Sequence, residues 1–154
     1  MRDALLAAGA SPGEQSTLNI ARIEAGRPAW GVDMDESTLV QEARMDELHA
    51  ISYNKGCYTG QETVARVHFR GHVNRLLRGL HFSGGVAAPP GSAIVRADGT
   101  SAGEVRGVAT SPRLGTIGLG LIRREVEPGS PLVARWDDGA GSAEVQVVTL
   151  PFGD

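Results

Sequence analysis

Cysteine is nearly absent from this 154-residue chain, and long apolar runs are absent altogether. The single cysteine, Cys57, excludes an internal disulfide framework and any zinc or iron–sulfur site built from several cysteines of this chain. No apolar run approaches the roughly 20 residues of a membrane-spanning helix. The first residues turn polar too soon for a secretory signal peptide. These absences predict a cytoplasmic protein that does not enter a membrane.

Lysine is equally scarce: Lys55 precedes Cys57 by two positions, and every other basic side chain is an arginine. In a chain that uses arginine everywhere else, this lysine indicates a need for a compact, rotatable ammonium group. An ammonium group beside a thiol can lower the pKa of the thiol and favour the reactive thiolate. The alternative is an inert buried cysteine, against which the polar neighbours of Cys57 argue.

The net charge of −3 hides two segments of opposite charge. Residues 33–47 carry six carboxylates against Arg44, and residues 55–78 carry five cations against Glu62. A basic segment in an acidic chain indicates an anionic ligand, such as a polyglutamate tail, a phosphate or RNA. A solvated helix face followed by a basic turn explains the same charges about equally well.

The first quarter of the chain has a helical pattern. Residues 2–8 are expected to form a short helix. Ser11, Pro12 and Glu14 make a capping box, with Ser11 as the N-cap, and predict a second helix over residues 12–25. A glycine follows directly and is placed to end that helix.

Residues 27–54 lack a sustained hydrophobic period. An extended stretch is expected at residues 30–33 and a helical turn at residues 44–50. A third helix is expected from residue 59 or 60 to residue 67 or 69. Its positive N-terminal end would lie just after Cys57 and would also favour a thiolate.

Short strands separated by turns follow residue 73. Turn signals include a Pro-Pro-Gly stretch at 89–91 and the Asp-Gly pair at 98–99, which is a strong hairpin signal. Five or six strands at a spacing of about ten residues predict a small closed or partly closed antiparallel β-barrel. The predicted fold class is therefore α+β, with a helical or irregular segment over residues 1–73 and a barrel domain over residues 74–154. The expected strands lie at 75–82, 93–95, 103–110, 115–123, 132–136 and 143–150.

Two patterns resemble known sites without completing them. His68 and His72 have the spacing of a metal-binding pair, but Gly71 intervenes and no third ligand is evident, so no metal site is predicted. A glycine-rich stretch lacks the surrounding βαβ unit of a dinucleotide-binding fingerprint. It fits a strand at a tight barrel wall instead; its glycines are Gly115, Gly118 and Gly120.

The stretch Lys55-Gly56-Cys57-Tyr58-Thr59-Gly60-Gln61-Glu62, followed by Ala65-Arg66, resembles the signature of the YgfZ family. These proteins are folate-binding relatives of the glycine-cleavage T-protein, an aminomethyltransferase (GcvT). Residues 21–33, 111–120 and 150–152 resemble other family segments. The resemblance covers essentially the whole chain, which would correspond to the C-terminal half of a family protein. Residues 1–73 would then be the C-terminal part of the folate-binding domain, without its N-terminal part.

The resemblance implies a tetrahydrofolate-dependent role in making or repairing iron–sulfur proteins, and thereby in tRNA modification. It implies that Cys57 is the functional thiol and that Glu24 helps to hold the pterin. A carboxylate suits that task because it accepts two hydrogen bonds from the amino-pyrimidine edge. Further cofactor-binding residues would be Lys55, Tyr58, Gln61, Glu62 and Arg66. Expected partners are folate, iron–sulfur proteins or assembly factors, and RNA.

Three chemical questions stay open at this point. Cys57 could supply one ligand to a transient iron–sulfur cluster shared with a partner. The chain could also belong to a folate-dependent one-carbon transferase, although true aminomethyltransferases lack the Lys-Gly-Cys-Tyr signature, so that activity is not expected here. It could finally be a non-catalytic module whose basic segment, residues 55–78, docks RNA or a protein.

Overall fold

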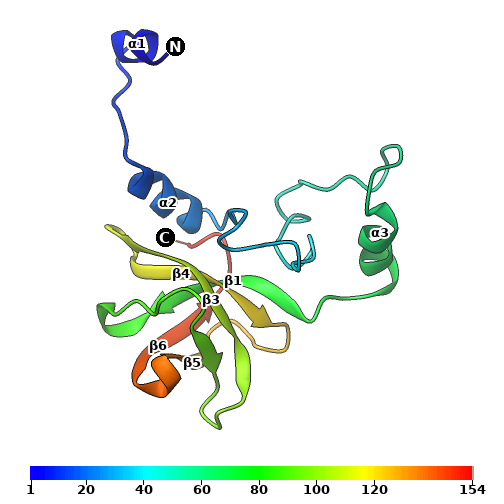
Figure 1. Cartoon of the computed structure of the whole chain (residues 1–154), viewed down its shortest axis with the longest axis vertical. Coiled ribbons are helices and arrows are strands. Elements are labelled where there is room, and N and C mark those ends of the chain that lie inside the picture. The colour runs from blue at the N-terminus through cyan, green and yellow to red at the C-terminus, as the bar shows by residue number, and fades with distance from the viewer. Residues whose placement is uncertain (154) are drawn as a thin grey trace.

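The computed structural model describes residues 1–153, in which helices precede a β-barrel (Figure 1). The helices of these residues are α1 (Arg2–Ala7), α2 (Gln15–Glu24) and α3 (Gln61–Arg70). The strands are β1 (Arg75–Phe82), β2 (Ala93–Val95), β3 (Ser101–Ser111), β4 (Gly115–Arg123), β5 (Pro131–Trp136) and β6 (Gly141–Val148). The predicted α+β class is confirmed.

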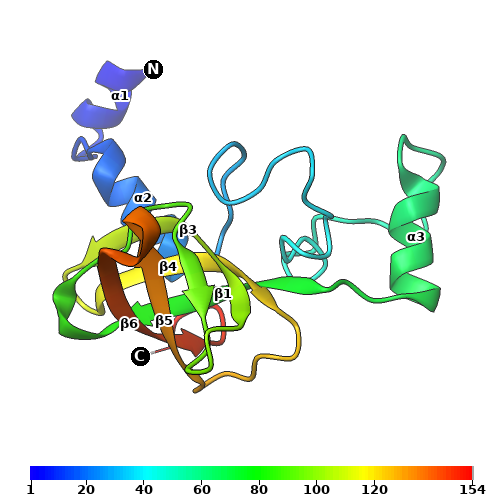
Figure 2. The same cartoon turned by 60° about the horizontal axis from the view of Figure 1, so that its bottom comes forward.

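The six strands form a closed antiparallel barrel in the order β1-β4-β3-β2-β5-β6 (Figure 2). Closure comes from β1, which pairs with β4 on one side and with β6 on the other. Strand β6 alternates as a half-buried strand should, with Ala143, Val145 and Val147 buried and the residues between them exposed. The inward side chains of the strands fill one core cluster, so the barrel is a packed body.

A second core lies outside the barrel, between β4 and α2. Ile117, Leu119 and Leu121 alternate with the inward-facing residues of β4 and pack against Ile23, which has no exposed surface. Burial on both faces explains why β4 reads as a nearly continuous apolar run. Helix α2 is therefore fixed on the barrel wall by its last turn.

The glycines of β4 stand where the strands approach closely. A Cβ atom at Gly118 would lie 2.9 Å from the carbonyl oxygen of Gly107 on β3, and one at Gly120 would lie 2.9 Å from that of Glu104. Ordinary Cβ atoms do not approach this closely. The prediction of a tight barrel wall is confirmed.

The capping-box prediction for the second helix is wrong. Helix α2 begins at Gln15 with Glu14 as its N-cap, so Ser11 lies outside the helix. The stretch before it is exposed and has no packing partner to support a first turn, and Gly13 disfavours a helix by roughly 1 kcal/mol. The C-terminal end agrees with expectation: Gly26 takes a left-handed φ of 62° just after the helix.

The extended stretch expected at residues 30–33 is also wrong, because the chain turns there. The amide of Asp33 donates to the carbonyl of Ala29 at 2.9 Å, and Gly31 has a φ of 75°. Residues 44–50 do form a helical turn, with the amide of Leu48 bonded to the carbonyl of Arg44 at 3.0 Å. The hydrogen bonds of the buried Asp33 side chain, described below, explain the turn at residues 30–33.

Residues 51–73, called the arm below, project from the barrel and carry α3 at their far end (Figures 1 and 2). The arm packs on the preceding loop: the Gln41 side-chain amide donates to the carbonyl of Val64 at 2.8 Å. Among residues 1–153, no helix has the length and apolar character that crossing a membrane requires.

Candidate functional site

Cys57 lies in an exposed loop at the head of α3. Residues 54–60, called the signature loop below, connect Tyr53 to the first helical residue, and the thiol-bearing residue is exposed. Gly60 is the N-cap with a φ of 84°, a left-handed conformation that glycine adopts without strain. The predicted helix start after Cys57 is therefore confirmed, and an accessible thiol stands beside it.

Lys55 is held over an aromatic ring of the same loop. Its Nζ atom lies 4.8 Å from the centroid of the Tyr58 ring, within the range of a cation–π interaction. The hydroxyl of Tyr58 is buried and has no hydrogen-bond partner among the described residues. The loop thus holds the lysine, the thiol and a tyrosine within four consecutive positions.

The base of the loop is held by Tyr53. Its hydroxyl donates to Oδ1 of Asp46, and its ring stacks on that of His68 with centroids 3.9 Å apart. Phe69 meets both rings edge-on, at 6.0 Å from Tyr53 and 4.8 Å from His68. Burial, followed by the hydrogen bond to Asp46, raises the pKa of Tyr53 to about 12, so its hydroxyl stays protonated at neutral pH.

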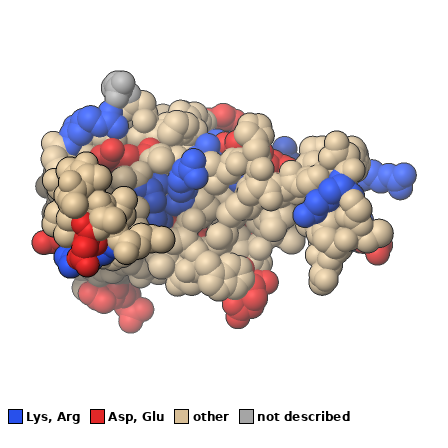
Figure 3. Space-filling model, turned by 90° about the horizontal axis from the view of Figure 1, so that it is seen from above, with Lys and Arg blue, Asp and Glu red and all other residues tan. Residues whose placement is uncertain are grey.

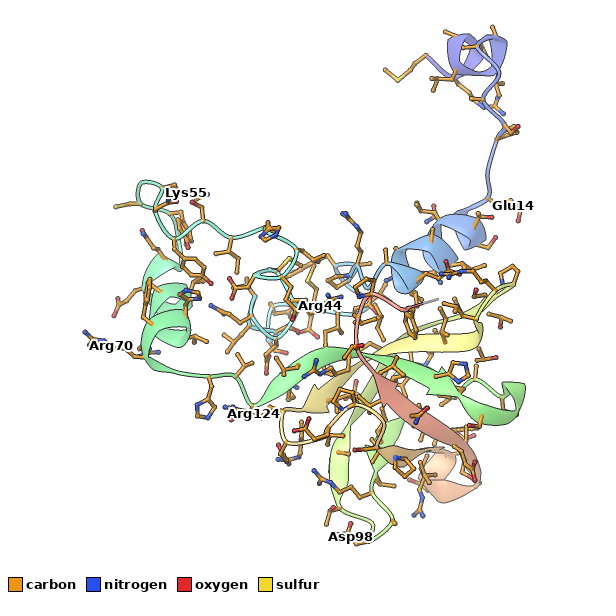
Figure 4. The ribbon with its side chains drawn as sticks, turned by 180° about the vertical axis from the view of Figure 1, so that it is seen from behind. Glu14, Arg44, Lys55, Arg70, Asp98 and Arg124 are labelled. Atoms are coloured by element: carbon orange, nitrogen blue, oxygen red, sulfur yellow. The ribbon has the colours of Figure 1, made fainter. Side chains whose placement is uncertain are left out.

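Three other predicted site residues lie along α3. Gln61 is half-buried, whereas Glu62 and Arg66 are exposed on the outer face of the helix. Glu62 and Arg66 line a shallow hollow together with Ala65, Phe69 and Arg70. Figure 4 shows Lys55 near one end of α3 and Arg70 at the other, so the basic side chains follow the arm.

Glu24 lies elsewhere, at the end of α2 against the barrel. Its Oε1 atom accepts a hydrogen bond from Ser111 Oγ at 2.5 Å, and Oε2 lies 3.5 Å from Arg113 Nη2. The side chain is 23% exposed. The structure therefore brings Lys55 and Cys57 together with the residues of α3, but it does not bring Glu24 to them, since α2 and α3 lie on separate parts of the molecule (Figure 1).

The sequence reading missed a buried ion pair beside Glu24. Asp33 has no exposed surface, accepts hydrogen bonds from the amides of Ala29 and Gly107 at 2.8 Å each, and pairs with Arg22. A Cβ atom at Gly107 would lie 2.5 Å from Asp33 Oδ1, so the glycine lets the carboxylate reach β3. The sequence shows Asp33 next to Val32 in a short apolar stretch, which could have indicated a buried carboxylate. No local pattern identifies Arg22 as its partner.

Two further arginines connect the loop over residues 34–50 to the barrel. Arg44 is buried and donates to the carbonyl oxygens of Gly26 and Leu150 at 3.1 Å each. Arg75 on β1 binds the buried Glu42 carboxylate through two hydrogen bonds of 3.0 and 3.1 Å, which raise the pKa of Arg75. These contacts fix the root from which the arm extends.

The two candidate metal-binding histidines are separated by the end of α3. His68 belongs to the helix and stacks on Tyr53, whereas His72 follows the C-cap residue Gly71. Residues 1–153 contain no group of three or more His, Cys, Asp or Glu side chains arranged to hold a metal ion.

Comparison with solved structures defines the class of fold. The chain superposes on the glycine cleavage system aminomethyltransferase T from Bartonella henselae with a TM-score of 0.73, at 20% sequence identity. The match covers 88% of this chain and 37% of that chain. The helices followed by a six-stranded antiparallel barrel are therefore a GcvT-like fold.

Comparison with sequences defines the family. The family model described as CAF17, C-terminal beta-barrel domain, matches residues 74–151. The tRNA-modifying protein YgfZ of Sodalis glossinidius is 31% identical over 136 residues, which are 86% of this chain and 41% of that protein. The mitochondrial iron–sulfur cluster assembly factor IBA57 homolog of Mycosarcoma maydis is 35% identical over 88 residues, 56% of this chain and 22% of that protein. The chain belongs to the CAF17/YgfZ/IBA57 family, as its sequence resemblance predicted.

The matches also show how much of each relative this chain covers. The chain spans less than half the length of the curated relatives that it matches.

Proposed function

We propose that this chain forms the C-terminal part of a tetrahydrofolate-binding protein that helps to assemble or repair iron–sulfur clusters, and thereby supports tRNA modification. The observation that carries the proposal is the exposed Cys57 in the signature loop at the head of α3. The names of two relatives, a tRNA-modifying protein and an iron–sulfur cluster assembly factor, support the same role.

The chemistry of the loop fits the transfer of a cluster. A thiolate is a standard ligand of iron–sulfur clusters, and a single exposed thiol can supply one ligand while a partner protein supplies the others. Lys55 places a positive charge in the same loop, where it favours bound anionic groups. We expect the cluster to be cargo, held between Cys57 and a partner.

Glu24 retains the acceptor capacity that a pterin requires. Each carboxylate oxygen accepts about two hydrogen bonds, and the bond from Ser111 and the contact with Arg113 leave part of that capacity unused. Glu24 would therefore accept hydrogen bonds from the amino-pyrimidine edge of tetrahydrofolate, which carries one-carbon units when bound. The barrel turn would orient this carboxylate through Ser111.

The role of the thiol can be tested in bacterial cells that lack their own YgfZ. The cells would receive a chimera in which residues 15–154 replace the matching part of a bacterial YgfZ, and the activity of an iron–sulfur tRNA-modifying enzyme would be measured. We expect rescue by the unmodified chimera and a loss of at least about tenfold with Cys57→Ala, because no other cysteine of this chain can replace the ligand. Asn54→Ala, an exposed change in the same loop, is the control. Full rescue by Cys57→Ala would refute the proposal.

Folate binding is tested separately on the same chimera by calorimetric titration with tetrahydrofolate. Glu24→Gln should weaken binding by about tenfold or more, since a charge-assisted hydrogen bond contributes roughly 1.5–3 kcal/mol. The matched control is Glu36→Gln, an exposed carboxylate of the loop that follows α2. Equal affinities for the two variants would contradict a pterin site at Glu24.

The outer face of α3 favours a second candidate function, the docking of single-stranded RNA. Arg66 and Arg70 are exposed there beside Phe69, whose side chain is 69% exposed, and the right-hand lobe of Figure 3 shows basic side chains on this part of the molecule. An exposed aromatic ring between arginines suits a stacked base and its phosphates. Replacing both arginines by glutamate should abolish binding of an RNA oligonucleotide that weakens steeply with salt. Arg135→Glu on the barrel is the control, and binding indifferent to salt and to both changes would exclude this function.

A further inference from the structure

The signature loop has few supports of its own. Asn54, Lys55, Gly56 and Cys57 are all exposed, and the loop reaches α3 through Gly60, a residue with wide conformational freedom. A loop of this kind holds a thiol in one place only when its ends are fixed by the rest of the chain. The structure shows such an attachment at the N-terminal end of the loop, at Tyr53.

The Tyr53 side chain joins three separate segments. Tyr53 contacts Asp46 through its hydroxyl and His68 through its ring. Asp46 belongs to the helical turn at residues 44–50, and His68 belongs to the last turn of α3. Nδ1 of His68 also lies 3.9 Å from Oδ2 of Asp46, so the three side chains form a closed triangle.

The triangle is connected to the segments after α2 and β6 and not only to the arm. Arg44, two residues before Asp46, donates to the carbonyl of Leu150 in the C-terminal segment and to that of Gly26 after α2. Figure 4 shows Arg44 between the barrel and the arm that carries Lys55. A displacement of Tyr53 would therefore weaken the attachment of the loop to the rigid part of the molecule, to which the bond from Gln41 to Val64 also contributes.

The geometry points to Tyr53 and Asp46 as positioning residues for Cys57: their hydrogen bond, together with the Tyr53–His68 stack, sets where the signature loop presents its thiol. This inference rests on the proposed function of Cys57. It assigns the two residues no contact with cargo or cofactor. Because the pKa of Tyr53 is about 12, the hydroxyl remains a donor throughout the neutral range.

The first test measures loop order without any activity. In the 154-residue chain, hydrogen exchange at the amides of Gln61 and Val64, which bond to carbonyls of the signature loop, should become about tenfold faster with Tyr53→Phe, which removes the hydroxyl and keeps the ring. Asp46→Ala should give at least the same change, whereas Asp46→Asn keeps an acceptor oxygen and should restore most of the protection. The double variant Tyr53→Phe/Asp46→Ala should match Asp46→Ala alone, because Asp46→Ala already removes the hydrogen bond from Tyr53 together with the contact to His68. Additive effects, or unchanged exchange in Tyr53→Phe, would overturn the inference.

The second test measures function and separates this inference from the proposed function. In the YgfZ chimera, Tyr53→Phe should lower rescue by about tenfold while the circular dichroism of the folded barrel at the growth temperature stays that of the unmodified protein, and Asp46→Asn should rescue well. Glu36→Ala is the control. If Cys57→Ala rescues fully, the proposed function fails whatever the exchange data show. If Cys57→Ala fails to rescue but Tyr53→Phe rescues fully, the positioning role is refuted and the proposed function stands.

Discussion

Asp33 has no exposed surface, yet its carboxylate satisfies two backbone amides and one guanidinium. These partners come from three places: the turn at Ala29, strand β3 at Gly107, and helix α2 at Arg22. A single side chain thus joins the loop, the barrel and the helix that carries Glu24. The position of Asp33 therefore helps to determine where Glu24, the candidate pterin-binding residue, lies.

Asp33→Asn should lower the free energy of unfolding by about 3 kcal/mol, because it leaves the Arg22 guanidinium without its charged partner in a largely buried site. Urea-induced unfolding followed by circular dichroism measures this loss. Glu36→Gln, an exposed carboxylate three residues further on, should leave the midpoint unchanged. A loss for Asp33→Asn no larger than that of the control would mean that the pair contributes nothing to stability.

Tyr53 should give the chain a distinct response to alkaline pH. Its folded pKa of about 12 lies above the ordinary value of 10.0, so the protonated hydroxyl stabilises the folded state. That contribution is full below about pH 10 and is lost as the pH rises through about 12. The difference in unfolding free energy between the unmodified chain and Tyr53→Phe should therefore stay constant from pH 6 to 9 and shrink above about pH 10. Urea titrations at each pH measure this difference. A difference that does not shrink above about pH 10 would contradict this assignment.

At the scale of elements, β4 is the strand on which both cores depend. It faces the barrel interior on one side and α2 on the other, and its glycines let β3 approach. Because both faces of β4 are packed, we expect that neither a polar nor a larger side chain is tolerated at its glycine positions.

Gly118→Ala should destabilise the chain by about 1–3 kcal/mol, because the new Cβ atom would press on the carbonyl oxygen of Gly107 at 2.9 Å. Thermal unfolding is the measurement. The matched change is Gly13→Ala, where a Cβ atom meets nothing within 4 Å and no loss is expected. Equal melting temperatures for both variants would show that the wall relaxes without cost.

The elements that the sequence predicted well are those whose signals are local. Strand β6 alternates along its own residues, the Asp98-Gly99 hairpin is contained in two positions, and α3 follows Gly60 as expected. The turn at residues 30–33 could not be predicted in this way, because it forms where Asp33 bonds to Gly107, 74 positions away. The capping box failed for a related reason, since a local motif at Ser11 had no tertiary contact to support it.

The candidate site divides along the same line. The signature loop and its helix follow from consecutive residues and were predicted. The role of Tyr53 was not, because its partners Asp46 and His68 lie 7 and 15 positions away on different segments. The separation of Glu24 from Cys57 is likewise a property of the fold, which no spacing in the sequence encodes.

The whole molecule combines a densely packed barrel with an arm that has little buried surface. Helix α3 has no buried residue, whereas every strand of the barrel contributes at least one. Segments with few buried contacts open at a lower free energy than the core does. The arm therefore opens more easily than the barrel does.

Brief digestion with trypsin should cut after Lys55, in the exposed loop, before it cuts within the barrel strands. Arg27 is also exposed, but the proline that follows it blocks cleavage there. Mass spectrometry of the early products identifies the order of cuts. Early cleavage after Arg96 or Arg123, in the barrel, would contradict this ranking of stabilities.

Closure of the barrel has a consequence for recognition. Each of its six strands is hydrogen-bonded on both sides, so the barrel offers no free edge to which another chain could add a strand. Association with a partner must then proceed through side chains and loops, whose contacts vary residue by residue. Partner choice in this molecule can therefore change by substitution on the arm while the backbone hydrogen bonding of the barrel stays the same.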